Sequence, residues 1–344
     1  MKCPYCFKTV KLRIQDRGKT HQYYCSECES EIHRAYVDYP GTPSTRIGMV
    51  GFTGHGKTVY ITSLFYQLQS LDSFWENYYF ETLDDYTHDI MFEKVLELKR
   101  GRLFSGTPIN FPEPAFIRFN NMPYFDDQIV SMYDIGGGVF DNPELMTQKG
   151  KYLAHSDTVF FIMSLVESDV ADDWNLKTMK LLDRYIHVVY SRFGANLSKK
   201  QNLVFVFTKS DELMKLENEK KPTPDLVDYF NRGTIEQYGM IYDYTFERIK
   251  HNSNNIENWL RSNNCNGFIN LAQNHFRTVG FVLVSALGVA PVDNKLTGEL
   301  SPNLPKCVID PFLWALYAPN VKSQHKWWSF NKMKWKRSIR KTKF

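Results

Sequence analysis

The stretch GFTGHGKT, residues 51–58, decides the fold. It fits the pattern G-x-x-x-x-G-K-[ST], with Gly51, Gly56, Lys57 and Thr58 at the required offsets. Glycines let the backbone turn tightly and direct successive N–H groups into one concavity, which suits a polyphosphate. Lys57 is placed to reach the outer phosphates, and the Thr58 hydroxyl is placed to complete the shell of a Mg²⁺ ion.

The residues on either side of this loop support the same interpretation over a chance match. Before it runs RIGMV (46–50), which is short and apolar like a buried strand. After it runs VYITSLFYQL (59–68), which has apolar residues at helical spacing and neither Gly nor Pro. The order strand, glycine loop, helix is the one that phosphate binding requires.

The composition is that of a folded protein. Of the 344 residues, 43% are hydrophobic and 15% aromatic, which excludes global disorder and allows a sizeable core. No apolar run reaches the length of a membrane span, and the start MKCPYC lacks the apolar segment of a secretion signal. We therefore expect a cytoplasmic protein without a transmembrane segment.

Four of the six cysteines lie within the first 28 residues, in the spacing C-x2-C-x18-C-x2-C. This spacing is typical of zinc ribbons, in which four thiolates hold a structural Zn²⁺. A disulfide pair and a redox C-x-x-C are the alternatives. His21 and His33 are interpreted as surface residues, because four thiolates already saturate zinc. The predicted ligands are Cys3, Cys6, Cys25 and Cys28.

The chain divides into four predicted segments. Residues 1–36 form the zinc ribbon, with a hairpin made by VKLRI (10–14) and HQYYC (21–25). Residues 37–45 contain the linker sequence DYPGTPST. Residues 46–320 form the nucleotide-binding domain with helical insertions, and residues 321–344 form a basic, aromatic tail.

Two further strand ends supply a magnesium ligand and a base reader. In QIVSMYDIGGG (128–138), Asp134 follows an apolar strand and is predicted to hold Mg²⁺, while the Gly137 N–H approaches the γ-phosphate. In NLVFVFTKSD (202–211), the carboxylate of Asp211 can accept from the N1–H and 2-amino groups of guanine. Adenine offers an acceptor there and would be repelled.

The remaining strands complete a sheet. FVLVSALG (281–288) ends in a Ser-Ala turn whose backbone N–H groups are predicted to bind the guanine carbonyl oxygen. DTVFFIMSL (157–165) is one more buried strand. Apolar strands that alternate with longer helical stretches predict an α/β fold with a doubly wound, mostly parallel sheet.

The ordered set GFTGHGKT, DIGG, TKSD and SAL resembles the Ras-like and translation-factor (TRAFAC) class of P-loop GTPases, over residues 46 to about 290. With the ribbon ahead of it, the chain is similar to bacterial double-GTPase-type proteins. The resemblance implies GTP or GDP with Mg²⁺ as ligands. It implies phosphate contacts from Gly51, Gly54, His55, Gly56, Lys57, Thr58 and Val59, magnesium contacts from Thr58 and Asp134, and guanine contacts from Thr208, Lys209, Asp211, Ser285, Ala286 and Leu287.

The sequence departs from this family at two positions. Thr208 stands where the guanine motif usually has Asn, and a hydroxyl contact is still available to it. Gly138 stands where Gln or His often orients the attacking water, so we expect slow intrinsic hydrolysis. A partner protein would then supply a catalytic group. His55 is a second candidate for that role, against a local structural one.

The γ-phosphate-sensing threonine of the first switch is harder to place, because 75 residues separate Thr58 from Asp134. Thr107 is the best candidate, since it precedes a predicted strand within FSGTPINFPEPAFIRF (104–119). Thr82 and Thr87 are the alternatives, although Thr87 lies in a stretch that resembles a helix ending at Gly101.

The segment between Asp211 and Ser285 includes DYTFERIKHNSNNIENWLRS (243–262), which predicts polar helices with an asparagine-rich interruption. An outer helical layer over the sheet is favoured over a partner surface. Cys265 and Cys307 are interpreted as buried small residues.

Nine of the 42 basic residues lie between Lys322 and Phe344, where there is no acid. Lysines interleaved with tryptophans suit an anionic membrane surface or the phosphates and bases of nucleic acid. A protein partner and a solvated tail are the alternatives.

These features together predict a GTP-binding molecular switch with slow, Mg²⁺-dependent hydrolysis that signals to an unidentified partner protein. The alternative is a binding module for nucleic acid or protein, built on the ribbon and tail, with a degenerate nucleotide domain. ATP-driven work is disfavoured, because T-K-S-D argues against adenine.

Overall fold

The computed structural model describes most of the chain between residues 2 and 317. The described ranges are 2–17, 20–38, 42–103, 114–122, 125, 127–165, 171–194, 200–217, 220–232, 245–291, 296, 298–301 and 304–317.

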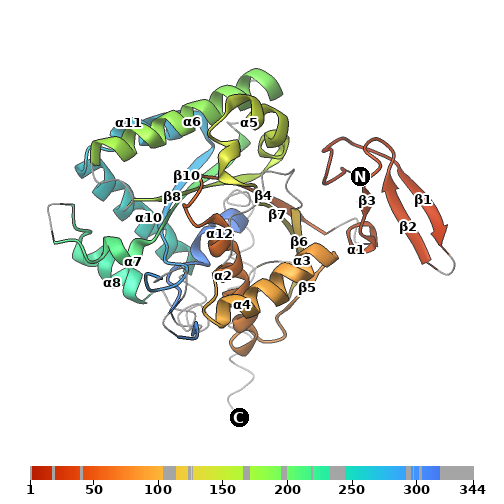
Figure 1. Cartoon of the computed structure of the whole chain (residues 1–344), viewed down its shortest axis with the longest axis horizontal. Helices are drawn as coiled ribbons and strands as arrows, with labels where there is room; N and C mark the ends of the chain where they lie inside the picture. Colours follow the sequence, from red (N-terminus) through yellow and green to blue (C-terminus); the bar gives the residue numbers. More distant parts are fainter. Residues whose placement is uncertain are drawn as a thin grey trace, which may run out of the picture.

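A seven-stranded sheet forms the centre of the predicted nucleotide-binding domain, in the order β10-β9-β8-β4-β7-β6-β5 (Figure 1). The five strands from β10 to β7 run parallel, and β6 and β5 form an antiparallel edge. The strands are β4 (Ser44–Val50), β5 (Tyr79–Thr82), β6 (Pro114–Asn120), β7 (Gln128–Tyr133), β8 (Thr158–Ser164), β9 (Asn202–Thr208) and β10 (Thr278–Leu283). The predicted fold class, α/β with a mostly parallel sheet, is confirmed.

The central strands are buried on both faces. Every residue of β7, β8 and β9 is buried, which explains why their sequences read as nearly continuous apolar runs rather than alternating ones. Strand β4 lies between β7 and β8, so the loop that follows it emerges at the middle of the sheet.

Helices cover both faces of the sheet, as a doubly wound fold requires (Figure 1). On one face Tyr60 of α2 packs against Phe160, and Trp314 of α12 covers Gly280. On the other face Tyr185 of α6 packs against Phe161. Among the described residues, the helices of eight or more residues are α2 (Lys57–Ser70), α6 (Ala171–Phe193), α8 (Pro224–Arg232), α10 (Thr245–Ser262), α11 (Asn266–His275) and α12 (Asp310–Tyr317).

Shorter helices join these elements. They are α1 (Arg34–Asp38), η1 (Leu71–Ser73), α3 (Asp85–Asp89), a π-helical turn η2 (Ile90–Lys94), α4 (Val95–Lys99), η3 (Gly137–Val139), α5 (Pro143–Lys149), η4 (Gly150–His155) and α7 (Ser210–Leu213). The helix expected around Thr87 is present as α3, η2 and α4, and Gly101 follows it with a left-handed φ of 75°.

Helix α10 is continuous through the asparagine-rich segment, where the sequence predicted an interruption. Its apolar residues Ile249, Ile256 and Leu260 share one buried face, and Ser253 of that face accepts a hydrogen bond from the Phe281 N–H of β10. Burial of this face overrides the low helix propensity of asparagine. The helix therefore covers the edge strand, as the favoured interpretation expected.

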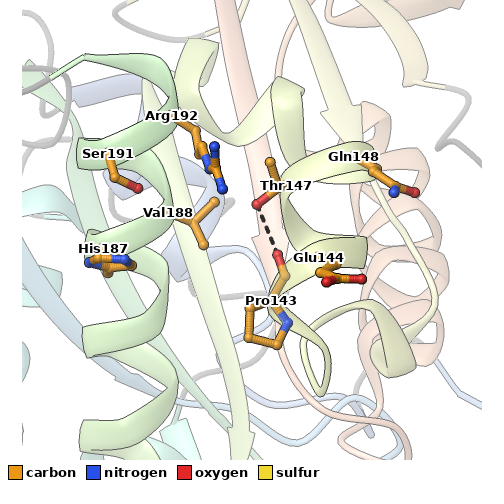
Figure 2. A pocket seen from close by; sticks show the side chains of 8 residues that line it. All are labelled: Pro143, Glu144, Thr147, Gln148, His187, Val188, Ser191 and Arg192. Carbon is orange, nitrogen blue, oxygen red and sulfur yellow. Dashed lines mark hydrogen bonds between the residues drawn. The ribbon is translucent and has the colours of Figure 1, made fainter.

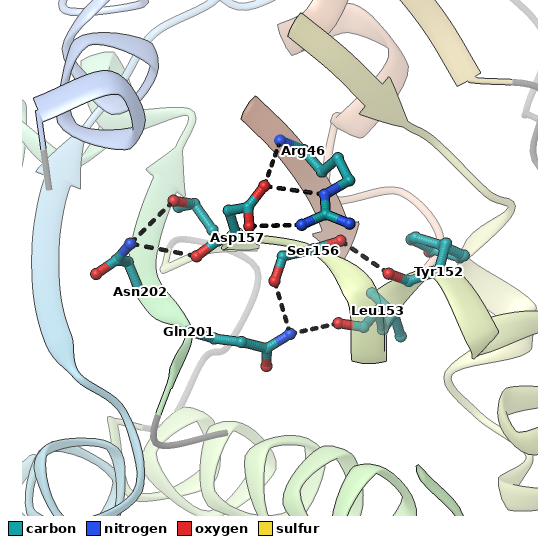
Figure 3. Close-up of polar contacts among 8 residues, drawn as sticks. Arg46, Tyr152, Leu153, Ser156, Asp157, Gln201 and Asn202 are labelled. Carbon is teal, nitrogen blue, oxygen red and sulfur yellow. Dashed lines mark hydrogen bonds and ion pairs between the residues drawn. The ribbon is translucent and has the colours of Figure 1, made fainter. Parts of the chain in front are cut away.

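The amino ends of β4, β8 and β9 are joined by a polar network (Figure 3). Arg46 forms a two-pronged ion pair with Asp157, at 2.8 and 3.0 Å, and both residues are only partly exposed. Gln201 donates to the carbonyl oxygens of Leu153 and Ser156. These bonds fix the strand ends opposite to those that carry the predicted nucleotide residues.

The ribbon is a separate three-stranded sheet of β1 (Leu12–Arg17), β2 (Thr20–Cys25) and β3 (Glu31–Ile32), all antiparallel. The two predicted strands are present, and β3 was not anticipated because two residues carry no periodic signal. Helix α1 and β4 reach into the predicted linker 37–45 from both sides, up to Asp38 and from Ser44.

The ribbon packs on the part of the sheet formed by β6 and β7. Tyr133 of β7 is fully buried and donates a hydrogen bond to the Pro4 carbonyl oxygen at 2.8 Å. The Phe7 ring stacks on His155 at 4.8 Å, and the Tyr5 ring meets Phe116 edge-on. The first cysteine knuckle of the ribbon therefore forms part of the core of the larger domain.

Across the described helices, none has both the length and the apolar character needed to cross a membrane.

Candidate nucleotide-binding site

The predicted phosphate loop has the geometry that its glycines imply. It connects β4 to α2, and Gly54 and Gly56 adopt left-handed φ values of 85° and 77°. A Cβ atom at Gly51 would lie 2.3 Å from the Ile162 carbonyl oxygen, so only glycine fits where the loop leaves the sheet. The loop is open to solvent at Thr53 and Gly54.

Lys57 lies under the loop. It is 6% exposed, and its Nζ donates to the carbonyl oxygens of Gly51 at 2.8 Å and Phe52 at 3.0 Å. Burial lowers the pKa of Lys57, and the carboxylates of Asp134 and Asp141 oppose that shift. A cation held in this position is suited to an anionic ligand at the loop.

Thr58 and Asp134 meet, as a magnesium site requires. The Thr58 hydroxyl donates to Asp134 Oδ2 at 3.1 Å, although 76 positions separate them in the sequence. Asp134 is 8% exposed. Both residues line a cavity of about 20 Å³, which is large enough for one water molecule or one ion. Oxygen ligands around a small cavity fit the hard cation Mg²⁺.

Gly137 lies directly against the phosphate loop. A Cβ atom at this position would be 2.1 Å from the Thr53 nitrogen and 2.4 Å from the Phe52 carbonyl carbon. The chain after Asp134 can therefore approach the loop only because residue 137 is glycine. Gly138 follows within the turn η3 and contributes no side chain.

Thr208 links the predicted base-reading segment to the phosphate loop. Its hydroxyl, 3% exposed, lies 2.9 Å from the His55 carbonyl oxygen and 3.0 Å from the Met163 carbonyl oxygen. The departure from Asn at this position is thus accommodated, because a hydroxyl is sufficient to join β9 to the loop. This contact also gives the His55 backbone a local structural role.

Asp211 and Ser285 also meet. The Ser285 hydroxyl donates to Asp211 Oδ1 at 2.5 Å and accepts from the Gly288 N–H at 2.9 Å. Asp211 Oδ2 is buried and has no hydrogen-bond partner among the described residues. A buried carboxylate oxygen in that state is costly unless a ligand supplies a donor. The donors on the edge of guanine meet this requirement.

The Ser-Ala turn provides fewer free amides than the sequence predicted. The Ser285 N–H donates to the Lys306 carbonyl oxygen at 3.1 Å, through a short β-bridge to that residue. The amides of Ala286 and Leu287 have no acceptor among the described residues, so a contact to a carbonyl oxygen would fall to them.

Helix α2 supports the turn from behind. The Ser63 hydroxyl donates to the Ala286 carbonyl oxygen at 2.7 Å, and the Tyr60 hydroxyl donates to the Val308 carbonyl oxygen at 3.2 Å. One helix thus connects the phosphate loop at its first turn to the base-reading turn along its side.

The three threonine candidates for the first switch lie in different surroundings. Thr107 lies outside the described residues. Thr82 ends the edge strand β5. Thr87 is fully buried, donates to Asp84 at 2.7 Å and accepts from the Phe116 N–H at 2.7 Å. The Thr87 hydroxyl therefore holds α3 against β6.

The four N-terminal cysteines form a compact cluster. Their sulfur atoms all lie within 4.8 Å of one another, and Cys3–Cys28 and Cys6–Cys25 are each separated by 3.7 Å. A tetrahedral Zn²⁺ with bonds of about 2.3 Å needs sulfur atoms about 3.8 Å apart. A disulfide needs about 2.05 Å. The geometry fits the metal and not the disulfide alternative.

Two residues at the site had no signal in the sequence. The buried ring of Phe140 lies 6.0 Å from Lys57 Nζ. Arg184 of α6 donates to the Phe140 carbonyl oxygen at 2.7 Å and so fixes the segment after the turn η3. Neither residue belongs to a motif, and only the folded chain brings them to the loop.

No protein-family model and no curated protein matches this chain. Among solved structures, it is similar to the Arl6 (BBS3) small GTPase from Trypanosoma brucei, whose structure was determined with the bound nucleotide analogue GppNp. The identity is 10%, the match covers 80% of this chain and 98% of that one, and the TM-score is 0.36.

Proposed function

We propose that the protein is a GTP-binding switch that hydrolyses GTP slowly in the presence of Mg²⁺. The observation that carries this proposal is the pairing of a phosphate loop with a buried, unsatisfied carboxylate oxygen on Asp211. The Thr208–His55 hydrogen bond ties the two halves of the site together. A nucleotide would be held at its phosphates by Lys57 and the loop, and at its base by Asp211.

The bound Mg²⁺ would supply charge neutralisation at the phosphates, and Thr58 and Asp134 would hold it. Lys57 would neutralise phosphate charge from beneath the loop, and the Gly137 N–H would be close enough to sense a γ-phosphate. Gly138 offers no group to orient a water molecule, which supports slow turnover unless a partner protein supplies one.

The segment that follows Gly137 would change its position according to whether GTP or GDP is bound. Helix α5 begins six residues later and faces α6 across a groove of about 500 Å³ (Figure 2). Glu144 and Gln148 of α5 and His187 and Arg192 of α6 give this groove a polar rim. A γ-phosphate contact that shifts Gly137 would move α5 against α6 and alter this surface for a partner protein.

The cysteine cluster supports a structural Zn²⁺ in the ribbon, with no chemistry of its own. Metal analysis of the purified full chain is expected to find one zinc ion per molecule. The basic tail lies outside the described residues, and its contact with a membrane or nucleic acid remains a prediction from its sequence.

The decisive experiment is calorimetric titration of the full chain with GTP, GDP and ATP, with and without Mg²⁺. We expect both guanine nucleotides to bind and ATP not to bind. Protein that ignores all three nucleotides but binds RNA in a salt-sensitive way would instead support the binding-module alternative.

Asp211→Asn tests the base reader. An amide can donate to the extra carbonyl of xanthine, so we expect the preference to move from GTP to xanthosine triphosphate by at least about tenfold. Glu212→Gln, which removes an acid from the adjacent position, is the matched control and should keep the preference for GTP. If Asp211→Asn also kept it, Asp211 would not read the base.

A further inference from the structure

The small cavity beside Thr58 and Asp134 has a second wall, and that wall carries a lysine. The cavity is lined by Tyr86, Ile90 and Lys94 on one side, and by Thr58 and Asp134 among the residues on the other. No motif in the sequence predicts this arrangement, since the first three residues belong to the segment between β5 and β6.

The wall is one face of a single helical stretch. Tyr86, Ile90 and Lys94 are spaced by four residues through α3 and the π-helical turn η2. Residues at this spacing lie above one another on a helix. The π-helical turn ends at Lys94, and such turns are frequent at functional sites. The hydroxyl of Thr87 fixes the start of this stretch to β6.

The charges around the cavity make Lys94 conspicuous. Among the described residues that line it, Lys94 is the only base and Asp134 the only acid, and Ile61, Ala115 and Met132 are apolar. Lys94 is half-buried and forms no hydrogen bond or ion pair with the residues that the structure describes. Apolar walls strengthen the effect of a charge, so an ammonium group here favours an anion.

We infer that Lys94 is a nucleotide-binding residue that neutralises phosphate charge on the magnesium side of the site. This inference rests on the proposed function. Lys57 would act from beneath the loop, and Lys94 would act from the cavity that the predicted magnesium residues Thr58 and Asp134 also line, where a γ-phosphate would add charge. Lys94 therefore favours the triphosphate over the diphosphate.

The test uses Lys94→Met, which keeps the length of the side chain and removes its charge. Arg100→Met is the matched control, because it removes a positive charge just beyond the same helical stretch, where Arg100 pairs with Glu97 at the surface. Affinities of the full chain for a non-hydrolysable GTP analogue and for GDP are measured by fluorescence, in Mg²⁺ and in EDTA.

Lys94→Met is expected to weaken binding of the GTP analogue about tenfold in EDTA and about threefold in Mg²⁺, and to change GDP binding less. The two cations compensate the same phosphate charge, so each matters more when the other is absent. Lys94→Arg, which keeps the positive charge, should bind the GTP analogue as the unmodified protein does. Arg100→Met should behave as the unmodified protein in every condition.

An equal loss for GTP analogue and GDP, with no difference between Mg²⁺ and EDTA, would show that Lys94 only supports the structure and would overturn the inference. Affinities equal to those of Arg100→Met would overturn it too. Failure of the proposed function is distinguishable, because the unmodified protein would then bind no guanine nucleotide at all.

Discussion

Thr208 stands where the resembled pattern usually has asparagine, and its hydroxyl still joins β9 to the phosphate loop. From the sequence alone, we expect only that a hydroxyl contact remains available at this position. The threonine hydroxyl makes the bridge to the His55 carbonyl oxygen, and it also lies within hydrogen-bond distance of Met163. The sequence identified the position, but the length of the bridge depends on how closely β9 approaches the loop.

Thr208→Val keeps the shape of the side chain and removes the bridge. We expect GTP affinity to fall about tenfold, because the loop loses a buried hydrogen bond of about 1 kcal/mol and its preorganised shape. Thr158→Val is the control, since Thr158 is also buried but lies at the amino end of β8, away from the phosphate loop. It should lower thermal stability with no change in GTP affinity, as measured by calorimetry.

At the scale of the element, the apolar runs were sufficient to predict the strands. β7, β8 and β9 lie where the sequence placed them, because strands buried on both faces carry the signal along their whole length. β10 (Thr278–Leu283) begins and ends earlier than the predicted 281–288, since it lies at the edge of the sheet and its first two residues are only partly buried. The loop and α2 were predicted from glycine spacing and helical periodicity. In α10 the prediction of an interruption was wrong, because Asn252 is buried in a packed face where intrinsic propensity does not decide.

Contacts between elements carry no such signal. Arg184 of α6 reaches the Phe140 carbonyl oxygen, and Lys94 reaches the cavity of Asp134, only through the tertiary arrangement. Neither residue lies in a motif, and their polar neighbours in the sequence are exposed. A single sequence therefore predicts which strand ends carry the candidate site, but not the residues that other helices bring to it.

Gly137→Ala tests the packing of the turn η3 against the phosphate loop. The added methyl group would lie 2.1 Å from the Thr53 nitrogen, so either the loop or the turn must move. We expect affinity for a GTP analogue to fall by at least about tenfold, with a smaller effect on GDP. Gly298→Ala, where a Cβ meets nothing within 4 Å, should bind both as before.

At the scale of the whole molecule, the ribbon has a small core of its own, and Phe7 joins it to the core of the larger domain. Tyr133, which donates to Pro4, immediately precedes Asp134 of the proposed magnesium site. Zinc removal by a chelator is expected to unfold the ribbon and to weaken GTP binding as well, because β7 loses a packed neighbour. Hydrogen exchange across 128–138 should rise with loss of the metal. Unchanged exchange there would contradict this coupling.

The interface also predicts a pH dependence. Burial beside Phe7, together with Lys2, Arg46 and Lys151, lowers the pKa of His155 to about 4. A histidine whose pKa is lowered on folding binds fewer protons in the folded state. Stability is therefore retained above about pH 6.5 and lost as the pH falls from there towards 4. His155→Gln should flatten this part of the profile in thermal unfolding.

The packing of Tyr5 and Phe7 into the larger domain bears on how the protein can be dissected. A shortened chain that begins at Ser44 would expose the rings of Phe116 and Tyr133 to solvent, because Tyr5 and Phe7 no longer cover them. The exposed rings would form a hydrophobic surface patch. Such a fragment is expected to aggregate even though its phosphate loop is intact. The cysteine-rich segment therefore covers hydrophobic residues of the larger domain, and we do not expect the two parts to be separable.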